Sequence, residues 1–322
     1  MGFLKNRSKY KKLKPKYIDN SKSNFRINRS YKSPHFKLFY NGKYIYFKTQ
    51  DSDDLRFNEL ICNEIAKQMH INCVEYNLAE LKYYGINYKG LISNDFVKDN
   101  QSFVPCATFS LGANDGLCGV VRNLKKFEKQ NKCVFDINKI EFDLFKIIVF
   151  DYLTCQSDRH DCNFGFIQDK GSYPPLLEVA PIFDSELSFG VTSKKNFKDI
   201  FSILNLNSRF TPYNFNNLNY NCIIGNENNI LTREIIYYAK NKPLLLDYVK
   251  FVIRDFNTAN LDKELKKKGI FVPKEKLELV GNIIDIKKRE LLKTYISMLT
   301  PKKDNINTNK KANDNTKKYT LE

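Results

Sequence analysis

Hydrophobic and polar residues alternate along the first third of the chain as they do in β-strands. The runs at 36–40 and 43–48 flank Asn41-Gly42, which supplies the two positive φ angles of a type I′ turn, so they predict a β-hairpin. Residues 74–83 and 86–97 have the composition of two further strands. These patterns predict a small antiparallel sheet.

Apolar residues recur at helical spacing in several longer segments. One such segment, residues 55–69, lies between the predicted hairpin and the later strands. Asp136 is expected to be the N-cap of a helix that runs to residue 155. Residues 98–135 contain a cluster of glycines and are expected to form an irregular loop. Further helices are expected at 231–240, 243–256, 261–268 and 274–298.

The order of these elements predicts an α+β chain with two lobes. The first would be a small antiparallel β-sheet lobe with one helix, and the second a larger, mainly helical lobe. The expected divisions are a basic N-terminal arm at 1–33, the first lobe at 34–97 with a hinge near 94–97, the second lobe at 98–300, and a disordered tail at 301–322.

Composition is that of a globular protein. The chain has 322 residues, of which 42% are hydrophobic, enough for a sizeable core. Its eight cysteines contain no C-x-x-C pair and its three histidines are not at ligand spacing, so neither a zinc site nor a disulfide framework is expected. No signal-peptide region or apolar run of membrane-spanning length is present, which predicts a cytoplasmic protein without membrane insertion and leaves export by a non-Sec route open.

The net charge of +17 is concentrated at the ends of the chain. Residues 1–37 hold twelve Lys or Arg and one acidic residue, Asp19, and so carry most of it. A solvated basic arm is the favoured interpretation. A weak contact between this arm and nucleic acid is the alternative.

Glu59 is a carboxylate at a position that is expected to be buried, so it needs a partner. It lies in the apolar stripe of the predicted helix, and a carboxylate buried there without a partner would cost several kcal/mol. Lys48, at the end of the preceding strand, is the nearest candidate in sequence and is expected to pair with it. The alternative is that Glu59 lies at the edge of the stripe with its carboxylate in water.

A second group of polar residues follows the helix that begins at Asp136. Asp158 stands where a carboxylate could accept a proton from a hydroxyl, and Asn163 and Asp184 offer the oxygen ligands that Mg²⁺ prefers. A predicted hairpin formed by 164–168 and 176–183 would fold Asp184 back beside Asn163. Together with Lys48 and Glu59, these are the parts of an ATP-dependent phosphotransferase. Adenine would then bond to main-chain groups of the hinge at Asp95 to Val97.

The sequence resembles the HipA-like kinases, particularly their compact CtkA-type members. The catalytic pattern D-R-H-x-x-N-x-G stands here at residues 158–165, and the A-P-x-x-D pattern stands at residues 180–184. The resemblance extends more weakly to Lys48, Glu59 and the hinge Asn94-Asp95-Phe96.

This resemblance implies a bilobal protein-kinase-like fold, ATP and Mg²⁺ as cofactors, and transfer to Ser or Thr of a protein substrate, with autophosphorylation. The implied roles are a catalytic base (Asp158), metal ligands (Asn163, Asp184), a phosphate-binding lysine (Lys48) and its partner (Glu59), and further nucleotide-site residues (Asn94, Asp95, Phe96, Val97, His160). Ser30 and Ser33 are the implied candidates for autophosphorylation, because family members can phosphorylate their own phosphate loop.

Some features depart from standard protein kinases and keep two alternatives open. Ser185-Glu186 follows Asp184 where kinases have Phe-Gly, and the region expected to cover the phosphates, residues 29–34, lacks glycine. A phosphoinositide-type lipid kinase shares D-R-H-x-x-N, although Ala180-Pro181 favours the HipA-like interpretation. The other alternative is an inactive nucleotide-binding regulator whose basic arm binds nucleic acid.

Overall fold

The computed structural model describes eleven stretches of the chain. They are residues 11–13, 17–19, 35–50, 52–83, 85–108, 116–131, 135–156, 159, 162–171, 176–190 and 231–299. The tail at 301–322 and the two candidate acceptors Ser30 and Ser33 lie outside the described residues, so the predictions made for them stay predictions.

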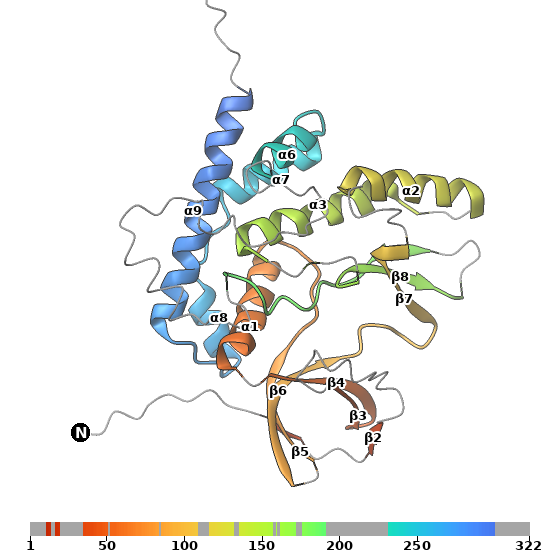
Figure 1. Ribbon diagram of the computed structural model, residues 1–322, viewed down its shortest axis with the longest axis vertical. Coiled ribbons are helices and arrows are strands. Elements are labelled where there is room, and N and C mark those ends of the chain that lie inside the picture. The colour runs from red at the N-terminus through yellow and green to blue at the C-terminus, as the bar shows by residue number, and fades with distance from the viewer. Residues whose placement is uncertain are drawn as a thin grey trace, which may run out of the picture.

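The first lobe is built on a six-stranded sheet in the order β1-β5-β6-β4-β3-β2 (Figure 1). Its strands are β1 (Lys11–Leu13), β2 (Tyr17–Asp19), β3 (His35–Tyr40), β4 (Lys43–Thr49), β5 (Asn77–Tyr83) and β6 (Ile86–Asn94). Neighbouring strands run antiparallel, except that β1 is parallel to β5. The predicted hairpin is confirmed, since Asn41 and Gly42 have φ angles of 49° and 80°. The expected N-terminal arm contributes β1 and β2 to this sheet.

The alternation within β4 separates two environments. Ile45 and Phe47 are buried in a small apolar cluster on one face of the sheet, whereas Lys48 points to the other face. Strand β6 lies close beside β4 at this point, because a Cβ atom on Gly90 would come within 2.2 Å of the Lys48 carbonyl oxygen. Gly90 therefore lets β6 run next to the strand segment that carries Lys48.

Helix α1 (Asp53–Gln68) joins the sheet to the second lobe. The side chain of Ser52 caps its first turn by accepting a hydrogen bond from the Asp54 amide, at 3.1 Å. Its apolar side chains belong to the large core shared with the second lobe, as expected for residues 55–69. The opposite face of α1 is covered as well, because Glu64 is buried and pairs with Lys268 beyond the end of helix α8 (Leu261–Lys267).

The expectation of an irregular loop at 98–135 was wrong. Strand β7 (Gln101–Pro105), a 3₁₀ turn (Cys106–Thr108) and the 16-residue helix α2 (Gly116–Asn131) lie in this segment. The strand forms because it pairs with β8 (Gly165–Asp169), whose residues are 60 to 68 positions away, and the sequence near β7 does not indicate that partner. The glycine cluster was interpreted as a loop signal, but helix α2 begins at one of these glycines, Gly116.

The second lobe is mainly helical. Helix α3 (Ile137–Thr154) has Asp136 as its N-cap, as predicted, and leads to the three-stranded sheet β7-β8-β9, in which β9 is Leu177–Val179. Helices α6 (Leu231–Ala239), α7 (Pro243–Arg254), α8 and α9 (Lys274–Leu299) confirm the four helices expected after residue 230. Across the described residues, no helix has the length and apolar character needed to cross a membrane.

Candidate active site

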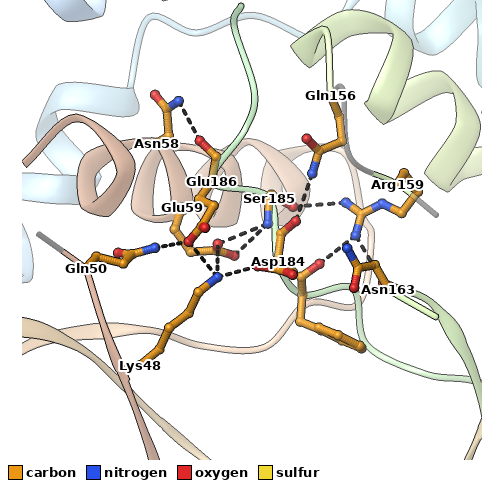
Figure 2. A network of polar contacts seen from close by, with 11 residues as sticks. Lys48, Gln50, Asn58, Glu59, Gln156, Arg159, Asn163, Asp184, Ser185 and Glu186 are labelled. Carbon is orange, nitrogen blue, oxygen red and sulfur yellow. Dashed lines mark hydrogen bonds and ion pairs between the residues drawn. The ribbon is translucent and has the colours of Figure 1, made fainter. Parts of the chain in front are cut away.

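The predicted partner of Glu59 is in place. The Lys48 ammonium lies 3.6 Å from Oε2 of Glu59, and it also contacts the carboxylates of Asp184 and Glu186, the latter at 2.6 Å. Figure 2 shows the four side chains converging from strand β4, helix α1 and the segment after β9. The Lys48 ammonium thus forms ion pairs with three carboxylates. The role of Lys48 in binding phosphates stays a prediction.

Glu59 is buried, with only 2% of its surface exposed, so the alternative that its carboxylate lies in water is wrong. Both of its oxygens accept a hydrogen bond from the Ser185 amide, at 3.0 Å each. Burial raises the pKa of Glu59 to about 7; Lys48 lowers it, and Asp184 and Glu186 add to the rise. Burial lowers the pKa of Lys48, but the three carboxylates together outweigh this and raise it well above 10.5, so Lys48 stays charged.

Asp184 has a backbone conformation that few residues adopt. Its φ angle is 60°, in the left-handed region that Asp and Asn tolerate better than most residues do. The Gln156 side chain donates to the Asp184 carbonyl at 2.9 Å, and Ile182 forms two backbone hydrogen bonds, each 2.9 Å long, with residues 72 and 74. These contacts from both lobes set where the Asp184 carboxylate lies.

Arg159 connects the two halves of the site. Its guanidinium forms a buried ion pair with Asp151 of α3, at 3.2 Å, and donates to the Ser185 hydroxyl at 3.0 Å. One of its nitrogens, Nη1, also donates to the carbonyl oxygens of both Asn163 and Phe183. The backbone at Asn163 is therefore held next to the backbone that leads into Asp184, as the predicted β8–β9 hairpin requires.

Arg159 holds the backbone of Asn163 next to that of Phe183, the residue before Asp184, and binding of a metal ion by Asn163 and Asp184 stays a prediction. Asn163 is 7% exposed, and Figure 2 shows it next to the Arg159 guanidinium. Asp158, the predicted base, and His160 lie outside the described residues, so their roles stay predictions.

Sequence reasoning missed several members of the polar network. The Gln50 side chain donates to Glu186, and the Asn58 side chain donates to the carbonyl oxygens of Glu186 and Ser188, at 2.8 and 2.9 Å. Asp151 could have been identified by the argument used for Glu59, because it is also a carboxylate on the apolar face of a helix and needs a partner there. Glu186 could not, since a glutamate after a β-strand is most often a surface residue.

The predicted hinge follows the last residue of β6, Asn94. The Asp95 carboxylate pairs with Lys37 of β3 at 3.0 Å and accepts the Val97 amide hydrogen bond at 3.0 Å. The Phe96 ring stacks on that of Phe183, the residue before Asp184, with 5.7 Å between ring centroids. The predicted hinge thereby contacts the segment that carries Asp184, a predicted metal ligand. Binding of adenine by Asn94, Asp95, Phe96 and Val97 stays a prediction.

Comparisons with known proteins identify the fold. No protein-family model and no curated protein matches the sequence. The crystal structure of the Helicobacter pylori proinflammatory kinase CtkA is similar, with a TM-score of 0.60 and 16% sequence identity over 82% of this chain and 93% of that chain. The chain has the fold of the CtkA kinase.

A chain of the Shewanella oneidensis complex of HipA, HipB and operator DNA is also similar, with a TM-score of 0.47 and 16% identity over 82% of this chain and 63% of that chain. The likeness to CtkA confirms the bilobal kinase-like fold and supports the resemblance to HipA-like kinases.

A kinase-like fold implies ATP and a divalent metal ion, and the side chains present suit both. Glu59, Asp184 and Glu186 each place a carboxylate oxygen within 4.8 Å of the others. Oxygen donors of this kind are the ligands of Mg²⁺. The charged Lys48 beside them is the type of group that binds a phosphate.

Proposed function

We propose that the protein is an ATP- and Mg²⁺-dependent protein kinase that transfers the γ-phosphoryl group to Ser or Thr hydroxyls, including hydroxyls of its own chain. The observation that carries this proposal is the convergence of Lys48, Glu59 and Asp184 in a chain with the fold of CtkA. In kinases, a strand lysine paired with a helix glutamate binds the phosphates, and an aspartate nearby binds the metal.

Each described residue has a specific task under this proposal. Lys48 binds the α- and β-phosphates and is oriented by Glu59, whose carboxylate is itself fixed by the Ser185 amide. Asp184 and Asn163 would hold Mg²⁺, which neutralises charge on the phosphates when bound. Arg159 keeps the backbones that carry these two ligands side by side.

The chemical step needs one further residue. The acceptor oxygen attacks the γ-phosphorus, the bond from the γ-phosphorus to the β,γ-bridging oxygen breaks, and ADP leaves. The proton of the acceptor hydroxyl passes to Asp158, the carboxylate that precedes Arg159 in the D-R-H segment. Ser30 and Ser33 are the first acceptors to examine, and an unidentified protein substrate is the second.

The direct test is mass spectrometry of the purified protein after incubation with Mg-ATP. Phosphate on a Ser or Thr residue of the wild type, and none on Asp158→Ala, is the expected result. Parallel incubations with casein and with phosphoinositide vesicles distinguish a protein kinase from a lipid kinase. Transfer to lipid alone would reject the acceptor class, and equal transfer by Asp158→Ala would reject the assigned base.

A further inference from the structure

Glu186 is closer to Lys48 than Glu59 is. Its Oε2 atom lies 2.6 Å from the Lys48 ammonium, whereas Oε2 of Glu59 is 3.6 Å away. In the standard kinase pattern, the second residue after the metal-binding aspartate is a glycine, which has no side chain to make this contact. Glu186 therefore adds an anion to the lysine that is expected to bind phosphate.

The backbone around Glu186 is held from helix α1. Asn58 donates to the carbonyl oxygens of Glu186 and Ser188, and Glu59 accepts from the Ser185 amide. The Glu186 side chain itself is 22% exposed, in contrast to the 3% of Glu59. Its carboxylate can consequently move away from Lys48 by rotation about side-chain bonds while the main chain stays in place.

Gln50 holds the Glu186 carboxylate where it is. The Gln50 amide donates to Oε2 of Glu186, the same oxygen that contacts Lys48. Gln50 is 2% exposed, and its own Oε1 atom has no hydrogen-bond partner in the part of the chain that the structure describes. A buried amide with one hydrogen bond, directed at Glu186, favours the orientation that points the carboxylate at Lys48.

We propose that Glu186 is an internal anion that occupies the phosphate-binding side of Lys48 in the free protein and is displaced when a nucleotide binds. The inference rests on the proposed function for one point, that nucleotide phosphates bind at Lys48. A phosphate and the Glu186 carboxylate are both anionic oxygen acceptors and compete for the same ammonium. Part of the free energy of nucleotide binding is then used to break the contact between Glu186 and Lys48.

The test compares the dissociation constants of ATP and ADP for the wild type and Glu186→Gln by calorimetry. Glutamine has the shape of glutamate without its charge, so the variant is expected to bind both nucleotides about tenfold more tightly, a change of about 1.4 kcal/mol. The gain should appear in excess EDTA as well as in Mg²⁺, because the competition involves Lys48. Glu278→Gln, which removes a surface carboxylate paired with exposed Lys274 of α9, is the matched control and should leave binding unchanged.

Two further variants distinguish competition between Glu186 and the nucleotide for Lys48 from other roles of Glu186. Gln50→Met keeps the carboxylate but removes the amide that orients it, and should also tighten binding, by less than Glu186→Gln. In a Lys48→Met background, Glu186→Gln should have no effect, because the site of competition is gone. A gain that persists in that background would overturn the proposal.

The outcomes also distinguish a failure of this inference from a failure of the proposed function. Weaker binding by Glu186→Gln in Mg²⁺ only would make Glu186 a metal ligand, and unchanged binding would make it a structural residue; each result overturns the inference and leaves the kinase proposal intact. Absence of nucleotide binding by the wild type and every variant would reject both.

Discussion

The Nζ atom of Lys48 and the Oε2 atom of Glu59 lie 3.6 Å apart, on a strand that ends at Thr49 and a helix that begins at Asp53. The pair sits where the sheet of the first lobe meets the core of the second, as Figure 1 shows for β4 and α1. Because Asp184 reaches the same ammonium from the second lobe, Lys48 links both lobes through its charge. This link makes the site sensitive to single substitutions.

Replacing Lys48 with Met should lower phosphoryl transfer by about a hundredfold or more, the usual cost of removing one fixed electrostatic contact in an active site. Initial rates of autophosphorylation with Mg-ATP measure the effect. Lys43→Met, which alters an exposed lysine on the same strand, is the control and should keep wild-type activity. Equal rates in the two variants would contradict the assignment of Lys48.

Replacing Asp184 with Asn should abolish transfer and weaken nucleotide binding in Mg²⁺ while the fold is kept, because Asn also tolerates a φ angle of 60°. Asp184→Ala should show the same functional loss. Its free energy of unfolding should also be about 1 kcal/mol lower than that of Asp184→Asn, since alanine is strained in that conformation. Urea denaturation of both variants measures the difference. Identical stabilities would argue against strain at this position.

Replacing Arg159 with Met should reduce the free energy of unfolding by about 3 kcal/mol or more, because it removes the cation that pairs with Asp151 in a fully buried position. Transfer should fall as well, since the backbones of Asn163 and Phe183 lose a shared donor. Arg289→Met, on the exposed face of α9, serves as the control in denaturation and activity measurements. A denaturation midpoint of Arg159→Met equal to that of the wild type would show that the guanidinium does not hold the backbones of Asn163 and Phe183 together.

Lys276 should make the stability of the protein depend on pH. Burial lowers the pKa of this lysine to about 8, although its contacts with Asp54 act in the opposite direction. In the unfolded chain its pKa is near 10.5, so between pH 8 and 10.5 the unfolded state binds more protons and the free energy of unfolding rises with pH, by about 3 kcal/mol in total.

The difference between the wild type and Lys276→Met isolates this contribution, because all other groups titrate in both proteins. Denaturation midpoints from pH 7 to 10.5 should rise in the wild type relative to the variant. Lys274→Met removes an exposed lysine from the same helix and should follow the wild type. A wild-type curve parallel to that of Lys276→Met would show that the lysine is not desolvated.

The sequence by itself determined the elements that depend on neighbouring residues. The hairpin at Asn41-Gly42, helix α1, the N-cap at Asp136 and the four C-terminal helices follow from turn chemistry and periodicity. The burial of Glu59 was also predictable, since its place in an apolar stripe required a cation, and Lys48 stood at the end of the preceding strand.

Only the tertiary structure decided the relationships between segments far apart in the chain. Strand β7 forms because β8 lies beside it, and Arg159 matters because it joins Asn163 to Phe183. The contact of Glu186 with Lys48 spans 138 positions and leaves no local pattern, because an ion pair depends on where two charges lie in space and not on the residues next to them.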